Sequence, residues 1–362
     1  MAKFDIPGNY DKVSNAYFND AWDHLSTHIT YSKNNNEIFV YSNYPEYLEN
    51  SHRGDAGTPH YINKVDVSGK TKMLIYATHH LEYLSGSYYF AIRVFNPSST
   101  KSVQFTKARE GFSNSNSWFN PGYAWEDFNN KYDSLTLGPN ETNWLVTKAV
   151  PTTGNSSGSF LDYFGEFEVN NPFTIAIYIC KNINNVPGIT YELDWDNHNT
   201  YSGFANNYSL NCTKTLDMAD ALVSYEKSFF FGISNPYEGL GGNSEKVTFY
   251  PNQSGYGAVN ENIGNYGLQY NFRFTFKNTS NKPVKVKCYI ISNTRSHFAG
   301  IASLNRASKF LSSENSSDPN RWNFHTTNTI APSGNSVTID FTYCHLALGS
   351  RGAILQFEAV EA

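Results

Sequence analysis

Hydrophobic and polar residues alternate with a period of two along most of this chain. Phe272, Phe274 and Phe276 lie on one face of a segment whose other face carries Arg273 and Lys277. The same pattern recurs over residues 90–94, 173–179 and 337–343. Because successive side chains of a β-strand point to opposite faces, this alternation predicts strands with one buried face. We therefore expect an all-β protein.

Turn-forming residues separate the predicted strands. Asn96-Pro-Ser-Ser follows one strand, and Asn278-Thr-Ser-Asn follows another. Such residues either set the dihedral angles of a turn or bond their own backbone. Many short strands with regular turns are typical of β-sandwiches, of the jelly-roll or immunoglobulin-like kind.

The two halves of the chain resemble each other. Residues 90–103 match residues 272–284, since both run from a strand through an asparagine-led turn into a second strand. Two more pairs of segments keep the same order. Residues 40–48 parallel 232–240 upstream, and residues 135–142 parallel 330–337 downstream. The shared order and spacing predict an internal duplication.

The length of 362 residues predicts two domains, at about 100–200 residues per domain. We expect a short N-terminal arm over residues 1–24 and a first β-sandwich over 25–182. An asparagine-rich linker follows over 183–200, and a second β-sandwich over 201–362.

Composition narrows the classes of function. Charged residues make up 16% of the chain, against a globular norm of about 25%, and the net charge is −5. Without a Lys/Arg cluster we expect no nucleic-acid binding. No apolar run reaches the roughly 18 residues of a membrane helix, and the N-terminal residues lack the apolar core of a secretion signal. We therefore expect no transmembrane segment and no signal peptide.

One motif supports a family resemblance. Asn262-Ile-Gly-Asn-Tyr-Gly-Leu-Gln-Tyr270 precedes the strand over 272–276, and His297-Phe-Ala-Gly300 follows it. With these motifs, and with Met73–His80 in the first half, the sequence resembles uncharacterised tandem β-sandwich proteins of spore-forming Firmicutes. Many of those proteins carry copper amine oxidase N-terminal-type repeats. The resemblance covers about residues 30–360 and implies the tandem β-sandwich fold. Because this chain lacks the copper amine oxidase-type repeats, the resemblance implies no copper chemistry.

Few residues suggest a metal site. The adjacent residues His79 and His80 would point to opposite faces of a strand and could not chelate one ion. Asp194-Trp-Asp-Asn-His198 offers two carboxylates and an imidazole, but it lies in the predicted linker, where such residues are ordinary turn formers. We expect no metal and no cofactor.

Catalytic motifs are equally scarce. Glu166 and Glu168 share a strand face, which we interpret as a solvated face and not as a glycosidase pair. The sequence has no nucleophile elbow and no phosphate-binding loop after a strand, so we expect no enzyme. The tripeptide Arg53-Gly-Asp55 matches an adhesion motif, which we interpret as a chance occurrence.

The four cysteines are Cys180, Cys212, Cys288 and Cys344. None forms a C-x-x-C pair, which argues against zinc. We interpret them as buried free thiols, with a Cys288–Cys344 disulfide as the alternative.

Aromatic residues give the remaining functional signal. Residues 118–128 carry five aromatic side chains and are predicted to form a long loop. Trp118, Tyr123 and Trp125 are the candidate ligand-binding residues, because flat rings can stack on sugars or enter a lipid interface. The alternative is a loop that these rings hold against its own sandwich.

The weak charge and the abundance of Asn and Tyr favour a protein whose surface makes contacts with other molecules. Our leading hypothesis is a non-enzymatic, self-assembling structural protein of a spore-forming bacterium. It would be part of a parasporal crystalline inclusion in the mother cell, or be associated with the spore. Its partners would be copies of itself, and then a co-packaged insecticidal toxin or a surface glycan. The alternative is a glycan- or membrane-binding module or toxin that acts through aromatic loops.

Overall fold

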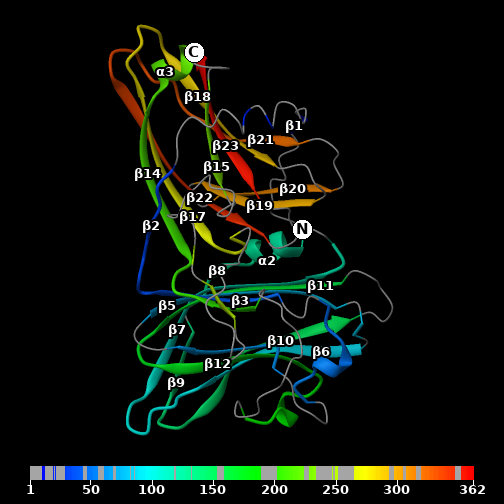
Figure 1. The fold of residues 1–362 in the computed structure, drawn as a ribbon. Coiled ribbons are helices and arrows are strands. Elements are labelled where there is room, and N and C mark those ends of the chain that lie inside the picture. Colours follow the sequence, from blue (N-terminus) through cyan, green and yellow to red (C-terminus); the bar gives the residue numbers. More distant parts are fainter. Residues whose placement is uncertain are drawn as a thin grey trace. The chain divides into compact units, whose positions relative to one another are not determined.

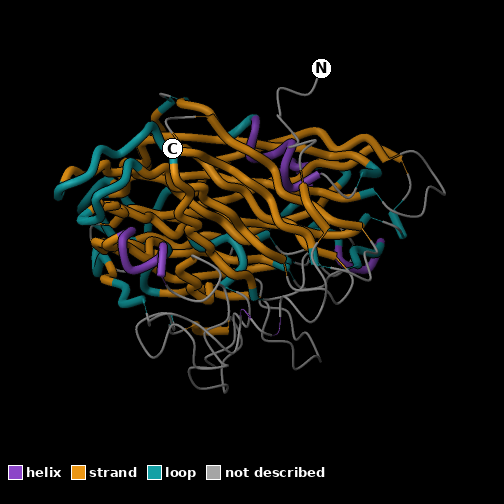
Figure 2. The backbone as a smooth tube through the Cα atoms, turned by 90° about the horizontal axis from the view of Figure 1, so that it is seen from above, coloured by secondary structure: helices purple, strands orange, loops and turns teal. Residues whose placement is uncertain are grey.

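The computed structural model consists mainly of β-strands, with few and short helices (Figure 2). It describes residues 10–12, 19, 21, 29–43, 47–55, 61–67, 71–81, 83–84, 86–117, 120–131, 133–152, 159–188, 202–223, 228–233, 247, 249–251, 265–292, 297–304, 307–314, 319–346 and 352–362. The chain forms two compact units. The first sandwich comprises Asn35–Tyr208 and Val247–Asn262, and the second comprises Met1–Asn34, Ser209–Lys246 and Ile263–Ala362.

The first sandwich packs a four-stranded sheet on an eight-stranded sheet. The smaller sheet has the order β10-β6-β12-β4, and the larger has β16-β13-β3-β5-β11-β7-β8, with β9 also paired to β7. Most of these strands are labelled in Figure 1. Alternate residues of both sheets, among them Phe90, Ile92 and Val94, form one buried cluster between the layers.

The elements of the first sandwich have these bounds: β3 Glu37–Ser42, β4 Asn63–Val67, β5 Thr71–His80, β6 Gly86–Phe95, β7 Val103–Ser115, α2 Asn120–Glu126, β8 Asn129–Asn130, β9 Ser134–Leu137, β10 Thr142–Thr152, β11 Phe160–Val169, β12 Phe173–Cys180, β13 Ser202–Ala205 and β16 Phe249–Pro251, with 3-10 turns at Asn50–His52 and Ile183–Asn185.

The second sandwich joins a five-stranded sheet, β1-β21-β18-β23-β15, to a six-stranded sheet, β2-β14-β17-β22-β19-β20. Its core is aromatic. The Phe274 ring of the larger sheet lies 4.5 Å from the Phe357 ring of the smaller one, and Phe276 lies 5.0 Å from Phe357. The alternation predicted at Phe272, Phe274 and Phe276 is confirmed, since all three are buried.

The elements of the second sandwich have these bounds: β1 Tyr10–Lys12, β2 Ser32–Lys33, β14 Ser209–Asp217, α3 Met218–Val223, β15 Ser228–Ile233, β17 Gln269–Asn278, β18 Val284–Ser292, β19 His297–Leu304, β20 Ala307–Glu314, β21 Asn320–Thr326, β22 Asn335–His345 and β23 Ala353–Glu361.

In the first sandwich, a buried asparagine holds the turn that crosses from one sheet to the other. Asn96 follows β6 and precedes β7, which belong to different sheets. Its Nδ2 donates to the carbonyl oxygens of Lys101 at 2.7 Å and Gly138 at 2.8 Å, and its Oδ1 accepts from the Ser98 N–H at 3.0 Å. One side chain thereby satisfies three buried or half-buried backbone groups.

Asn278 repeats this arrangement in the second sandwich, where it ends β17 and leads the turn into β18. Its Nδ2 donates to the carbonyl oxygens of Lys282 at 2.8 Å and Ile330 at 3.0 Å, and its Oδ1 accepts from the Ser280 N–H at 3.1 Å. The two turns lie in the segments that the sequence comparison paired. Their shared bonding pattern supports an internal duplication.

The two units are interleaved along the chain, whereas the sequence predicted consecutive domains. β1 lies in the predicted N-terminal arm and pairs with β21 of the second sandwich. β13 and Tyr208 lie beyond the predicted linker but belong to the first sandwich. Residues 183–188 of that linker pack on the four-stranded sheet, where Arg93 Nη1 donates to the carbonyls of Val186 at 2.9 Å and Pro187 at 2.7 Å. The rest of the linker lies outside the described residues.

Candidate functional site

The predicted aromatic loop contains a short helix, α2. Trp125 is 8% exposed, and its ring meets the Phe164 ring edge-on at 5.3 Å and lies 5.2 Å from the Phe128 ring. Tyr123 is half-buried. Trp118 lies outside the described residues. For Trp125 the structure favours the second interpretation, a ring that holds the loop on its own sandwich, over a stacking residue exposed to ligand.

Local sequence explains why α2 can lie so close to the sheet. Pro121 occupies the first turn, where its missing N–H costs no helical hydrogen bond. Gly111 of β7 lies beneath the helix, and a Cβ at this position would come within 2.0 Å of the Ala124 carbonyl oxygen. A glycine at this point therefore lets the helix backbone rest directly on the strand.

A buried carboxyl group links α2 to the sheet. Asp162 of β11 is 0% exposed, and its Oδ2 accepts from Asn120 Nδ2 at 2.6 Å. The Tyr76 hydroxyl lies 3.4 Å from Asp162 Oδ1. Burial raises the pKa of Asp162 to about 7, against hydrogen bonds from Asn120, Thr78 and Tyr76 that lower it. Sequence reasoning missed this residue, whose one signal was an acidic side chain inside an apolar strand.

The two adjacent histidines have separate environments. His79 Nε2 lies 3.1 Å from Ser42 Oγ, and both residues are buried. His80 packs between the rings of Tyr47 at 4.7 Å and Phe160 at 4.4 Å, and burial lowers its pKa to about 4. Ser42 and His79 are a nucleophile and a base in contact, but at 0% and 1% exposure a substrate could not reach them.

Glu166 and Glu168 differ, although they share a strand face. Glu168 is solvated, with 63% of its side chain exposed and Lys72 at 3.9 Å. Glu166 corrects the expectation of a fully solvated face. It pairs with Arg109 Nε at 2.6 Å and accepts from the Tyr208 hydroxyl at 2.9 Å. Its carboxylate is thus held by two partners inside the fold.

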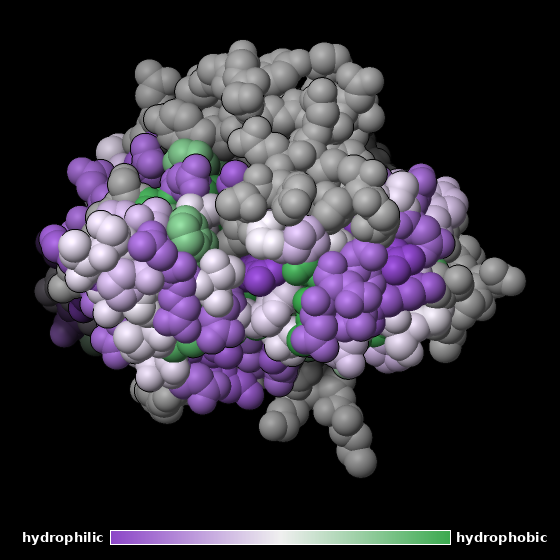
Figure 3. All heavy atoms as spheres, turned by 90° about the horizontal axis from the view of Figure 1, so that it is seen from below, coloured by the Kyte–Doolittle hydropathy of each residue, from purple (hydrophilic) through white to green (hydrophobic). Residues whose placement is uncertain are grey.

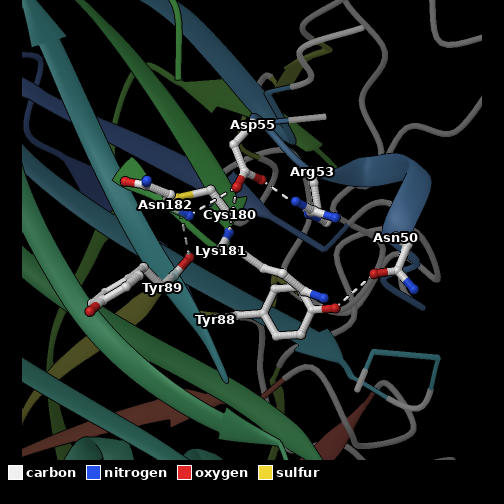
Figure 4. A network of polar contacts seen from close by, with 8 residues as sticks. All are labelled: Asn50, Arg53, Asp55, Tyr88, Tyr89, Cys180, Lys181 and Asn182. Atoms are coloured by element: carbon white, nitrogen blue, oxygen red, sulfur yellow. Dashed lines mark hydrogen bonds and ion pairs between the residues drawn. The ribbon is translucent and has the colours of Figure 1, made fainter. Parts of the chain in front are cut away.

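The tripeptide Arg53-Gly-Asp55 takes part in an internal network (Figure 4). Arg53 Nε lies 3.0 Å from Asp55 Oδ1, and Asp55 Oδ2 accepts from the backbone N–H groups of Lys181 at 3.1 Å and Asn182 at 2.9 Å. Burial alone would raise the pKa of Asp55, but these bonds outweigh it and hold the pKa below its ordinary value. With its side chain 3% exposed, Asp55 cannot serve as an adhesion ligand.

The four cysteines are free and buried, so the alternative of a Cys288–Cys344 disulfide is wrong. Burial raises the pKa of Cys212 to about 11 and of Cys180 to about 12. In the described part of the chain, no group of three or more His, Cys, Asp or Glu side chains could hold a metal ion. Residues 194–198 lie outside that part. The described helices are also too short or too polar to cross a membrane.

The strongest candidate for a functional surface is an edge strand, β15. It pairs with β23 and, among the described residues, with no second strand. Its sequence, Ser-Phe-Phe-Phe-Gly-Ile, has no charge and no proline. Of the edge strands that the structure describes, it is the longest with this character. An uncharged edge strand without proline is of the kind to which another strand can bond. Phe229 is half-buried, and the other residues of β15 are buried.

β10, an edge strand of the first sandwich, has the opposite character. A bulge interrupts its pairing between Trp144 and Val146, and Pro151 removes a backbone donor near its end. Lys148 reaches Glu110 of β7 at 2.8 Å and so places a charge against the facing sheet. Bulges, prolines and inward charges all oppose pairing at a sheet edge. The contrast makes β15 the edge better suited to bind another strand.

No protein-family model matches this chain. No curated protein matches it either. Among solved structures, the chain is similar to the tandem CBM22-1–CBM22-2 domain of Paenibacillus barcinonensis Xyn10C, at 8% identity and a TM-score of 0.14, covering 86% of this chain and 96% of that one. It is similar to the CUB1-EGF-CUB2 domain of human MASP-1/3 at 8% identity and a TM-score of 0.17, covering 82% and 99%.

A third similarity is to dimeric latent PorU from Porphyromonas gingivalis, at 8% identity and a TM-score of 0.15, covering 93% of this chain. The chain spans about a fifth of that protein's length, at 22% coverage. At TM-scores of this size, none of the three similarities informs the function.

Proposed function

We propose that this protein is a non-enzymatic structural protein that assembles with copies of itself. The observation that carries the proposal is the uncharged, phenylalanine-rich edge strand β15. Two copies could pair their β15 strands across a two-fold axis and so extend the five-stranded sheet from one molecule into the next. Backbone hydrogen bonds would supply much of the affinity, and the absence of charge on the strand would leave little repulsion.

The polar but weakly charged surface supports the same proposal. Figure 3 shows one face of the molecule; among the residues coloured there, hydrophilic and near-neutral ones predominate and hydrophobic ones are scattered. Several charges are paired within the fold, such as Lys282 with Glu361 at 2.7 Å and Arg109 with Glu166 at 2.6 Å. A net charge of −5 over 362 residues leaves little long-range repulsion between copies.

The polar clusters support a structural role better than a catalytic one. The Ser42–His79 pair and Asp162 are buried, and Glu166 is bound to Arg109 and Tyr208. A catalytic site needs its acid, base or nucleophile within reach of a substrate. Each of these groups instead joins one structural element to another.

The cellular form that we propose for the assembly is a parasporal crystalline inclusion, on the basis of the resemblance to proteins of spore-forming bacteria. A co-packaged toxin is the proposed second component. Expression in a sporulating host, followed by electron microscopy of the mother cells, tests this form. Ordered inclusions are expected. Dispersed protein in sporulating cells would contradict the inclusion but would leave association in solution to be judged separately.

Association in solution is tested by sedimentation velocity over rising protein concentration. We expect a concentration-dependent dimer for the natural chain. Phe229→Lys should abolish it, because Phe229 is a half-buried residue of β15 and a charge there opposes edge pairing. The matched control is Thr147→Lys, an exposed position on β10, which should leave the dimer intact. A natural chain that stays monomeric at millimolar concentration would overturn the proposal, as would equal loss of the dimer in both variants.

A further inference from the structure

Two exposed tyrosines lie side by side at one end of the first sandwich. Tyr47 is 41% exposed and Tyr83 is 56% exposed, and their ring centroids are 6.0 Å apart with 51° between the ring planes. The nearer face of Tyr47 packs on His80, whose ring lies 4.7 Å away. The two exposed rings, with the buried His80 ring behind Tyr47, form a small aromatic cluster, which we call the Tyr47–Tyr83 platform.

The backbone beneath this platform is held in place. Tyr47 forms a parallel bridge with His80, and the Leu48 N–H donates to the His80 carbonyl at 2.8 Å. On the other side, the Leu84 N–H donates to the Leu81 carbonyl at 3.0 Å and closes the turn that carries Tyr83. Leu48, Leu81 and Leu84 are buried in the core. The leucines thus anchor both segments, while the tyrosines between them remain in solvent.

The rings of the platform carry no charge, and an exposed carboxylate and an exposed amide follow Tyr47 in the chain. The lowered pKa of His80 leaves its ring uncharged at neutral pH. Glu49 and Asn50, which follow Tyr47 closely, are exposed. Asn50 Oδ1 already accepts from the Tyr88 hydroxyl at 2.7 Å, which fixes the position of that amide. An anionic membrane would meet a carboxylate here and no basic side chain among these residues.

We propose that the Tyr47–Tyr83 platform binds a neutral carbohydrate. The C–H face of a pyranose ring can pack on a tyrosine ring, and two rings tilted by 51° offer faces to two successive sugar units. Glu49 and Asn50, two and three residues after Tyr47, are exposed, and their oxygen atoms already accept from Ser51 Oγ at 3.4 Å and from the Tyr88 hydroxyl at 2.7 Å. An aromatic surface with a few fixed polar groups is typical of small-ligand sites. This inference does not rest on self-assembly, since β15 belongs to the second sandwich.

Binding is tested with the full chain on an array of neutral oligosaccharides of glucose, xylose, mannose, galactose and N-acetylglucosamine. We expect binding to at least one of these sugars. Tyr47→Ala and Tyr83→Ala should each raise Kd about tenfold or more, as expected when a central aromatic contact is removed. Tyr47→Phe should keep most of the affinity, because the ring and not the hydroxyl makes the contact.

The matched control is Tyr89→Ala, which removes a 38% exposed tyrosine of β6 that does not belong to the platform. It should leave Kd unchanged. Circular dichroism checks that each variant folds. Vesicles of phosphatidylcholine, with and without phosphatidylglycerol, serve as the membrane probe. The proposal is overturned if no sugar on the array binds, if Tyr89→Ala weakens binding as much as the platform variants do, or if only vesicles bind.

Discussion

Replacing Asp162 with asparagine should change how the stability of the first sandwich depends on pH. Burial raises the pKa of this carboxyl from 3.8 to about 7. Because the folded-state pKa lies above the unfolded one, Asp162 favours folding at acid pH, and its contribution is lost progressively as the pH rises from 3.8 to about 7. A difference of about 3 pKa units corresponds to about 4 kcal/mol at 1.36 kcal/mol per unit.

His80 has the opposite effect on the natural chain. Burial lowers its pKa from 6.5 to about 4, so its contribution is present above pH 6.5 and is lost as the pH falls towards 4. Between pH 4 and 6.5 the effects of Asp162 and His80 on the free energy of unfolding partly cancel. The pH dependence of the natural chain's stability would therefore hide both effects. The difference between Asp162→Asn and the natural chain isolates the carboxyl, because His80 contributes equally to each.

The assay is urea unfolding, followed by circular dichroism, at half-unit steps from pH 4.5 to 8.5. Asparagine has the shape of the protonated acid and can still accept from Asn120. We therefore expect near-equal stability at pH 4.5 and an advantage for the variant that grows to several kcal/mol by pH 8. Asp133→Asn is the control, since that side chain is 79% exposed. A difference for Asp162→Asn that stays flat with pH would refute the assignment of a buried, protonated carboxyl.

Three further results are expected. Gly111→Ala should displace α2 and lower the free energy of unfolding by about 2 kcal/mol or more. The control Gly138→Ala, whose Cβ would meet only Glu141 Oε2 at 3.3 Å, should change the free energy of unfolding little. Equal losses in the two variants would contradict the close approach of α2 to Gly111. Asn96→Ala and Asn278→Ala should each lower the free energy of unfolding by about 2–3 kcal/mol, because they leave buried carbonyl groups unpaired. Asn335→Ala, at an exposed position, should lower it only slightly. An unchanged stability for either of the first two variants would show that its asparagine does not anchor the turn. The native protein at pH 8 should react slowly with a thiol reagent and release all four cysteines only on unfolding; rapid labelling would exclude the buried thiols.

The strand pattern was predictable because one buried face of a sheet imposes a period of two. Phe272, Phe274 and Phe276 show this directly. The asparagine-led turns at Asn96 and Asn278 were the sequence signal for the predicted duplication. Helix α2 was not predictable from pattern. At seven residues it is too short to be stable on its own propensity and depends on contacts with the sheet. The Asn-Pro pair at its start was the available signal.

Long-range pairings left no local trace in the sequence. Glu166 was expected in solvent because its partner Arg109 lies 57 residues away along the chain. A bulge in β7 near Ala108 adds to the difficulty, since it shifts the pairing with β11 between Glu166 and Phe167. One extra residue reverses which side chains face the core, and no alternating pattern reveals it in advance. The pairing of β1 with β21 spans most of the chain and was equally hidden.

Symmetry limits what the β15 edge can build. Two copies that pair β15 antiparallel form an isologous contact, which uses the edge on both molecules and closes as a dimer. Further growth then requires a second, different contact. β10 is ill suited to provide it, because of its bulge, its proline and the inward Lys148. A lattice would therefore consist of β15-linked dimers joined through side chains of the weakly charged surface. Phe229→Lys should then abolish dimer and lattice together, whereas surface substitutions should dissolve a lattice into dimers.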